Sequence, residues 1–500
     1  MVVLKVDLNK YVRFCTLRFK YVLLCISWRR QGIKWGIAFG LTEVSKNPPT
    51  IVKLENRLSP VDFFTKLYAH YDYAYILESV EGPEKLAEYS FIGFDPLFVV
   101  TIKDGKAEVH DRTAGEKTLG KVDDPLLLIK GLIGNSPSLS KDYRFVGGAV
   151  GYISYDSIRY WEKLPEIAVD DLNLPDFEMG IFNDGIIFDH KSGEIFYHYI
   201  GESRFSQIAH FLERNCEFET FTYSEPKANI KKTEFEKMVT KAKEYIASGD
   251  IFQVVLSKRY EFKFNGSLIP FYKALRKINP SPYMYFLKMG SRQIVGSSPE
   301  MLVRVENGVI ETFPIAGTRP RAKNASENEV LTQELLLDPK ECAEHVMLVD
   351  LARNDIGKVS EFGTVCVPEF MKVHQYSHVQ HIVSKVTGKL RRGCDCYDAL
   401  RAVFPAGTVS GAPKVRAMEI IEESEPNRRG PYAGALGYFS YNGNADFAIT
   451  IRTLVAKEDR GYIQAGAGIV ADSIPEREWL ETEHKASALL KALQLSSEEE

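Results

Sequence analysis

Two pairs of glutamates at helical spacing are the residues of this 500-residue chain that most directly suggest chemistry. Glu341 and Glu344 follow an Asp-Pro pair typical of a helix start, and residues three apart share one helix face. Glu478 and Glu481 repeat the spacing in a second predicted helix, where Lys485 lies one turn further along the same face. Four such carboxylates could hold a hard cation such as Mg²⁺, with waters completing its octahedron. A capping box or a solvated helix face would explain the same spacing without a metal, so the metal-binding and the purely structural interpretations both stay open.

Three glycine-containing segments could offer backbone N–H groups to an anion. Residues 405–414 (PAGTVSGAPK) precede a helical run at 415–423, whose start could receive an anion. Residues 465–471 (AGAGIVA) are interpreted as a tight turn, either one that exposes its amides to a carboxylate or a plain one. Residues 314–321 (PIAGTRPR) add two arginines near another glycine turn. Arg452 ends an apolar strand-like run, so it either turns to solvent or clamps an anion inside a pocket.

The elements that must position these residues alternate between strands and helices. Short aromatic and β-branched runs between residues 51 and 225 predict strands at 73–78, 98–102, 180–188 and 195–200. Helical patterns occupy 60–68 and 205–215, residues 224–229 are expected to form a linker, and 231–248 is an amphipathic helix. Strands mixed with helices favour an α+β fold with large, mostly antiparallel sheets over a doubly wound parallel one.

The chain divides into three regions by composition. Residues 1–50 form an atypical basic extension, interpreted as a lineage-specific segment or an early start, with a transit peptide as the alternative. Residues 51–225 form an N-terminal region, and residues 230–495 carry the acidic pairs and the glycine-rich segments. The apolar stretch at 21–28 is too short to span a bilayer, so no membrane association is expected.

Composition excludes several classes of function. A net charge of -4 and 45% hydrophobic residues indicate a globular protein without the basic excess that nucleic-acid binding needs. The seven cysteines form no C-x-x-C pair, which argues against a zinc site. Reduced thiols fit a cytoplasmic location.

The motifs taken together resemble the chorismate-utilising enzymes, the family of anthranilate, aminodeoxychorismate, isochorismate and salicylate synthases. The resemblance runs from about residue 52 to 493 and is densest after residue 249. The motifs that carry it are GDIFQVVLS (249–257), GSSPE (296–300), PIAGTRPR (314–321), ECAEH (341–345), DLARND (350–355), PAGTVSGAPK (405–414) and GAGIVADS (466–473). It implies the family's architecture, in which outer helices flank large antiparallel sheets.

The resemblance also implies a role for each site residue. Glu344 and Glu481 would ligate Mg²⁺, while Glu341 and Glu478 would hold its waters. The residues expected to bind substrate carboxylates are Tyr432, Arg452, Gly466, Ala467, Gly468 and Lys485, and those expected to line the pocket are Gly317, Thr318 and Thr408. Cationic and amide donors in one dry site are what the two carboxylates of chorismate require.

Glu300 would be the general acid for the departing ring hydroxyl, and such a role requires a pKa raised by burial. His381 resembles the histidine associated with loss of pyruvate, although a lone histidine is more often part of a core. Water-adding members carry a lysine where this chain has Gln253, and aminodeoxychorismate synthases often carry one where it has Ala316. Neither residue can act as a base or a nucleophile. Ammonia is therefore the expected nucleophile and anthranilate the expected product.

A regulatory site is implied near the N-terminal region. Glu78 and Ser79 resemble the family's tryptophan feedback motif, joined there by Pro282, Tyr283 and Met284; a strand end and a buried turn are the alternative. An acid and a hydroxyl suit an ammonium group, and the tyrosine and methionine suit an indole. The family usually has a basic residue where this chain has Glu88.

No glutaminase sequence such as G-x-C-x-G is present, so a separate glutamine amidotransferase subunit is expected to supply ammonia. Three other functions were weighed. Aminodeoxychorismate synthase stays within the family, whereas a non-catalytic tryptophan-binding regulator would have lost the acidic pairs. A dinucleotide oxidoreductase, suggested only by residues 466–468, would need a strand–turn–helix unit that is missing here.

Overall fold

The structure of the protein is a computed structural model that describes residues 47–498, except 56, 81–87, 114, 135–142, 215, 217, 323 and 376–378. The basic extension up to residue 46 therefore lies outside the described residues. No described helix is both long and apolar enough to cross a membrane. The expected division into regions stays a prediction.

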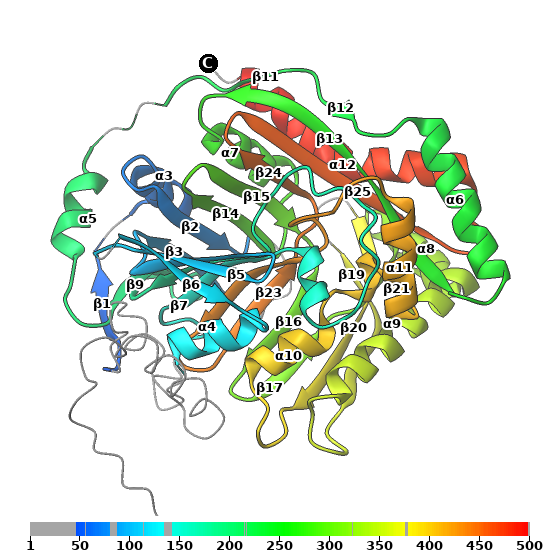
Figure 1. Cartoon of the computed structure of the whole chain (residues 1–500), viewed down its shortest axis with the longest axis horizontal. Coiled ribbons are helices and arrows are strands. Elements are labelled where there is room, and N and C mark those ends of the chain that lie inside the picture. The colour runs from blue at the N-terminus through cyan, green and yellow to red at the C-terminus, as the bar shows by residue number, and fades with distance from the viewer. Residues whose placement is uncertain are drawn as a thin grey trace, which may run out of the picture.

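Two large antiparallel sheets form the centre of the molecule, which confirms the predicted α+β class (Figure 1). The first sheet runs in the order β1 (Thr50–Leu54), β10 (Glu194–Tyr199), β9 (Asp184–Asp189), β3 (Tyr89–Phe94), β2 (Tyr73–Glu78), β14 (Tyr283–Met289), β15 (Arg292–Ser298), β24 (Thr453–Lys457), β25 (Arg460–Ile469), β13 (Gln253–Asn265) and β11 (Thr222–Tyr223), with β12 (Lys227–Ala228) and β21 (Gly411–Ala412) also on β13. The second runs β18 (Ile315–Pro320), β20 (Val379–Lys389), β17 (Val309–Thr312), β16 (Met301–Glu306), β23 (Ala445–Ile449), β22 (Ala435–Ser440), β7 (Gly148–Ile153), β8 (Phe177–Phe182), β4 (Phe98–Lys103), β5 (Lys106–Asp111) and β6 (Gly115–Lys121), with β19 (Cys366–Gln375) on β20. Each sheet combines strands from both the N-terminal and the C-terminal region.

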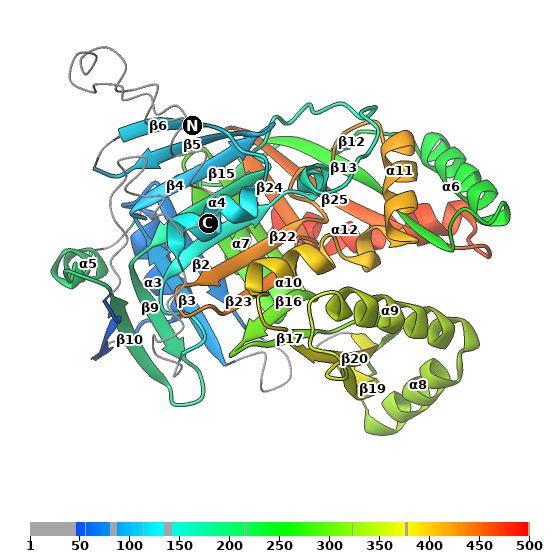
Figure 2. The ribbon, with the colours of Figure 1, turned by 60° about the horizontal axis from the view of Figure 1, so that its bottom comes forward.

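Helices cover the outer faces of the two sheets (Figures 1 and 2). They are α3 (Pro60–Tyr68), α4 (Pro125–Ile133), α5 (Phe205–Leu212), α6 (Lys232–Ala247), α7 (Ile269–Ile278), α8 (Ala325–Leu337), α9 (Pro339–Gly357), α10 (Cys396–Val403), α11 (Lys414–Ser424) and α12 (Pro475–Glu498), with 3₁₀ turns η1 (Tyr155–Tyr160) and η2 (Gly407–Val409). Most predicted helices appear within a few residues of their expected ends, because capping and amphipathic patterns are local signals.

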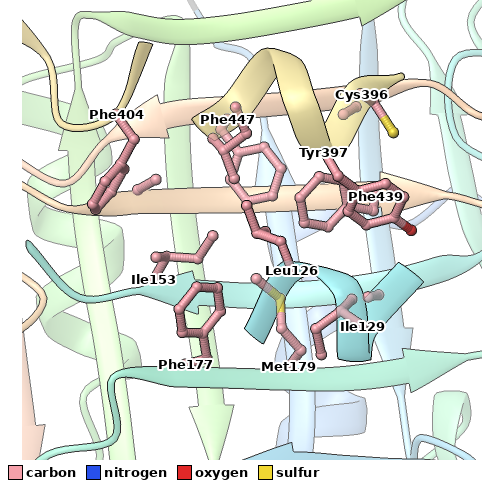
Figure 3. Close-up of a cluster of buried hydrophobic side chains, with 14 of the residues drawn as sticks. Leu126, Ile129, Ile153, Phe177, Met179, Cys396, Tyr397, Phe404, Phe439 and Phe447 are labelled. Carbon is pink, nitrogen blue, oxygen red and sulfur yellow. The ribbon is translucent and has the colours of Figure 1, made fainter. Parts of the chain in front are cut away.

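The core is layered in the same way. One apolar cluster lies between the sheets and includes Tyr75, Tyr285 and Tyr438. Another lies under α4 and α10, where the ring of Tyr397 stacks on that of Phe439 with centroids 4.3 Å apart (Figure 3). Burial of these aromatic side chains stabilises the packing of the two sheets on each other and of α4 and α10 on the second sheet.

Three sequence-based expectations about strands and turns are wrong. Residues 180–188 are two strands rather than one: β8 ends at Phe182 and β9 begins at Asp184 in the other sheet. Residues 224–229 are not a free linker, because β12 pairs with β13. Gly466, Ala467 and Gly468 do not form a turn, since they continue β25 and pair with residues 255–257 of β13. In each case pairing with a distant strand decides the conformation, which local sequence does not encode.

Candidate active site and effector pocket

The acidic pairs lie where α9 and α12 approach the ends of the central strands. Asp338 caps α9, accepting hydrogen bonds from the backbone N–H groups of Lys340 and Glu341. Glu344 accepts a hydrogen bond of 2.9 Å from the Gln253 amide at the start of β13. On α12, Glu481 forms an ion pair of 2.6 Å with Lys485. On these faces Glu478 is buried, Glu344 is partly buried, and the side chain of Glu481 is 46% exposed.

Electrostatics indicate that these carboxylates share one region. Burial raises the pKa of Glu344, and the negative charges of Glu341 and Glu481 raise it further. Burial likewise raises the pKa of Glu478, assisted by Glu481. Carboxylates that disfavour each other's ionisation form a donor set that a divalent cation would relieve.

The donor set fits Mg²⁺ by its chemistry, because the cation prefers a few carboxylates with water. Three of the carboxylates now have other partners: Glu344 accepts from Gln253, Glu481 is paired with Lys485, and Glu341 is paired with Arg319 at 3.5 Å. Within the described ranges, no three His, Cys, Asp or Glu side chains already converge at metal-ligand distances. Binding would therefore exchange the amide of Gln253 and the ammonium of Lys485 for the ion.

Glu300 lies in the turn between β15 and β16 and is almost fully buried. Burial raises the pKa of Glu300 to about 7, although the hydrogen bond from Thr408 and the charge of Lys485 both lower it. The hydroxyl of Thr408 donates to Glu300 Oε1 at 2.8 Å. A cavity of about 50 Å³ adjoins the carboxyl, between the second sheet and α9. A carboxyl half protonated near neutral pH can donate a proton, as the predicted role requires.

Replacing Thr408 by valine tests this balance. The variant removes a hydrogen bond that stabilises the carboxylate, so the pKa of Glu300 will rise further. If Glu300 acts in its acid form, the alkaline limb of the rate profile will move to higher pH, with a change in kcat within about tenfold. A pH profile of kcat measures this; a limb that moves to lower pH would contradict it.

Three of the expected carboxylate-binding residues lie together beside α12. Lys485 Nζ donates to the Gly466 carbonyl at 2.9 Å, and the Arg452 guanidinium donates to the backbone oxygen of Lys485 at 3.0 Å. A Cβ on Gly466 would lie 2.7 Å from the Tyr432 hydroxyl, so that ring closes over the strand. Arg452 therefore faces the helix and not the solvent. Its φ of 52° is uncommon for a non-glycine residue, and such conformations gather at functional sites.

Gly468, near the end of β25, lies where a larger side chain would meet Gln253. A Cβ on this glycine would lie 2.8 Å from the side-chain nitrogen of Gln253. We expect Gly468→Ala to place a methyl group against Gln253 in the expected substrate pocket, to disturb the position of the substrate, and so to lower kcat/KM by about tenfold or more. The matched control is Gly357→Ala at the end of α9, where a Cβ meets nothing within 4 Å. Steady-state kinetics of both variants measure the effect, and equal activities would contradict this reading.

His381, Gly317 and Thr318 meet at the irregular pairing of β18 with β20. His381 Nδ1 lies 2.8 Å from the Gly317 carbonyl oxygen and 3.1 Å from the Thr318 hydroxyl. Burial lowers the pKa of His381, so its ring is neutral near pH 7. An Nδ1–H that donates to the carbonyl leaves the lone pair on Nε2, the form able to accept a proton. Glu341 flanks the same turn, since a Cβ on Gly317 would lie 3.1 Å from its carboxylate.

The five residues expected to bind an effector also come together, about a cavity between the sheets. Glu78, Ser79, Tyr283 and Met284 line it, and the Ser79 hydroxyl donates to the Pro282 carbonyl at 2.9 Å. Tyr285, Leu436 and Tyr438 complete its apolar wall. Sequence reasoning missed Leu436, Tyr438 and Arg144, because β22 of the second sheet and the loop before β7 reach the cavity only through the tertiary fold.

Comparison with known proteins identifies the family. A family model described as chorismate binding enzyme matches residues 72–491. The chain belongs to the chorismate-binding enzymes. Anthranilate synthase component 1 of Methanothermobacter thermautotrophicus is 50% identical over 460 residues, which cover 92% of this chain and 97% of that protein. The same component of Aquifex aeolicus is 45% identical over 461 residues, covering 88% and 93%.

Solved structures of this family share the fold. Anthranilate synthase component I from Streptococcus pneumoniae superposes with a TM-score of 0.72 at 38% identity, covering 82% of this chain and 93% of that one. The menaquinone-specific isochorismate synthase of Escherichia coli has a TM-score of 0.67 at 18% identity, covering 89% and 95%. The second match shows the architecture alone. Both agree with the expected arrangement of large antiparallel sheets and outer helices.

Proposed function

We propose that this protein is the large, chorismate-aminating component of an anthranilate synthase that works in the cytoplasm. The observation that carries the proposal is the buried Glu300 of a chorismate-binding enzyme, whose pKa is raised to about 7 and which lies close enough to Lys485 to feel its charge. Arg452 donates to the backbone oxygen of Lys485 and adds a second cation. The relatives named anthranilate synthase component 1 at 41–50% identity support amination over the family's other reactions.

In this proposal the residues divide the work. Mg²⁺, held by Glu344 and Glu481 with waters on Glu341 and Glu478, would neutralise the ring carboxylate of chorismate. Arg452, Lys485 and Tyr432 bind carboxylates of the substrate, and Gly317, Thr318, Thr408 and residues 466–468 line the pocket. Neutralised carboxylates and a fixed ring orientation lower the barrier to attack at the neighbouring double bond.

The bond changes balance through two side chains. Ammonia forms a C–N bond at the neighbouring double bond, the ring double bonds shift, and the C–O bond to the hydroxyl breaks as Glu300 gives its proton and water leaves. The new ammonium group loses a proton to become the amine. His381, neutral with its lone pair on Nε2, would then take the ring C–H proton; the freed electron pair completes the aromatic ring as the ether C–O bond breaks, and the departing enolpyruvate takes up a proton at its methylene carbon to become pyruvate. Gln253 and Ala316 occupy the positions that hold lysines in other members. The chain therefore has neither the lysine base that activates water nor the lysine that attacks the ring.

Ammonia would come from a separate glutamine amidotransferase subunit. The proposal rests on the component 1 names of the relatives, which imply a second component. Tryptophan is proposed as the feedback inhibitor, since the cavity at Glu78 offers polar groups at one end and an apolar wall of tyrosine, methionine and leucine.

The test is a fluorescence assay of the purified protein with chorismate, ammonium chloride and Mg²⁺. Anthranilate that forms only with Mg²⁺ and decreases with tryptophan is the expected result, with EDTA as the control. Aminodeoxychorismate would favour the aminodeoxychorismate synthase alternative. A hydroxylated product would show that water, and not ammonia, is the nucleophile. No turnover together with tryptophan binding would favour a regulator.

A further inference from the structure

The effector cavity contains a buried arginine that its sequence neighbourhood did not reveal. Arg144 is 8% exposed and lines the cavity together with Ser79 and Tyr283. Its guanidinium carbon lies 5.8 Å from the centre of the Tyr89 ring, another wall of the cavity. A buried cation in a cavity whose other walls are mainly aromatic and aliphatic side chains, with Glu78, Ser79 and Asp446 as the other polar groups, is a ready partner for a carboxylate.

Two glutamates that are not among the lining residues of the cavity pair with Arg144. Its Nη2 donates to Glu88 Oε2 at 2.8 Å, and its Nε donates to Glu306 at 3.3 Å. The side chains of Glu88 and Glu306 are 33% and 39% exposed, so these ion pairs are screened and replaceable. A ligand carboxylate entering the pocket could take the place of Glu88 without leaving the arginine unpaired.

The acids inside the cavity are already matched. Glu78 is held by the Arg276 guanidinium at 2.8 Å and by the Tyr272 hydroxyl. Asp446 is held by Arg304 and by the hydroxyl of Tyr283 at 2.9 Å. Glu78 and Asp446 therefore have cations of their own, so exchange of Glu88 for a ligand carboxylate at Arg144 would leave neither of them unpaired.

The cavity also has an unsatisfied polar atom and limited space. The buried hydroxyl of Tyr438 has no hydrogen-bond partner among the described residues. The cavity measures about 40 Å³, which corresponds to no more than a few water molecules. An aromatic amino acid can enter only if the cavity widens, and the hydrogen bond from Arg144, which lines the cavity, to Glu88, the neighbour of the lining residue Tyr89, is one contact that can open.

We propose that Arg144 binds the carboxylate of an aromatic amino-acid effector and that Glu88 competes with the ligand as its internal counter-ion. The inference rests on the proposed feedback function and names the cation of that site. Arg144, in the loop before β7, would supply the positive charge for the ligand carboxylate that a basic residue at position 88 would otherwise supply. The Arg144–Glu88 pair must open for the ligand to bind, so the pair sets effector affinity.

Calorimetry with full-length protein tests this, using tryptophan and tryptamine, which lacks the carboxylate. We expect the wild type to bind tryptophan about 10–100-fold more tightly than tryptamine, the usual effect of a charged hydrogen bond. In Arg144→Met this preference disappears, whereas Arg112→Met, which loses an ion pair with Asp95 outside the cavity, keeps it. In Glu88→Gln the competing charge is gone, so tryptophan binds several-fold more tightly and tryptamine does not.

The outcomes separate this inference from the proposed function. If the wild type binds neither ligand, the proposed tryptophan site itself is contradicted. A wild type that binds tryptophan, with the full preference over tryptamine retained in Arg144→Met, overturns the role of Arg144 alone. Thermal melts check that Arg144→Met is folded. If it is not, Glu88→Gln decides, because unchanged or weaker tryptophan binding in that variant contradicts the competition.

Discussion

Glu300→Gln will lower kcat for the ammonia-dependent reaction by about 10²–10⁴-fold, the usual contribution of a general acid. Glutamine keeps the size of the side chain and can still contact Thr408, but it has no proton to give to the departing hydroxyl. KM for chorismate should change much less, because Glu300 acts on the leaving group. Anthranilate fluorescence at saturating chorismate and Mg²⁺ measures the effect.

The pH dependence of the wild type supplies a second readout. Burial raises the pKa of Glu300 to about 7, and the proposed mechanism requires the acid form. Activity therefore holds below that pH and falls as pH rises through it, when rates are compared at equal free ammonia. In Glu300→Gln this limb disappears. Glu194→Gln, which changes an exposed carboxylate paired with Lys53, serves as the matched control; an equal loss there, or an unchanged alkaline limb in Glu300→Gln, would refute the assignment.

Glu344→Gln will abolish Mg²⁺-dependent turnover, with a loss of at least about 10³-fold, while stabilising the metal-free protein. Substrate charge would no longer be neutralised beside Glu481, and such electrostatic terms contribute several kcal/mol. In the metal-free protein the same substitution removes a carboxylate whose charge is disfavoured by burial and by its neighbours. Its melting temperature is expected to rise by about 1–2 °C.

The sign of this stability effect follows from linkage. A carboxyl whose pKa is raised by folding stabilises the protein at low pH and ceases to do so as pH rises through the folded-state value. With EDTA present, wild-type stability should therefore fall more steeply than that of Glu344→Gln over this range. Added Mg²⁺ should raise the melting temperature of the wild type and not that of the variant. A variant that still responds to Mg²⁺ would show that Glu344 is not a ligand.

Many of the site residues could be predicted, because helix spacing is a local signal and because the motifs resemble those of a known family. Spacing placed Glu341 with Glu344 and Glu478 with Glu481 on common faces, and the structure buries Glu478 and partly buries Glu344 while Glu481 stays exposed. Their convergence with Gln253 is tertiary, since Gln253 and Glu344 are 91 positions apart. Likewise, Thr408 reaches Glu300 across 108 positions, and the raised pKa of Glu300 is a property of burial.

The sequence by itself determined the helices with strong caps, such as α9 behind Asp338, the amphipathic α6, the α+β class and the family. Those features depend on contacts within a few residues or on ordered motifs. Only the tertiary structure decided that the chain changes sheets at Asn183, that residues 466–468 continue a strand, and that Arg144 enters the cavity of Glu78. Strand pairing and burial join residues far apart in the chain, so their free energy depends on neighbours that local sequence does not specify.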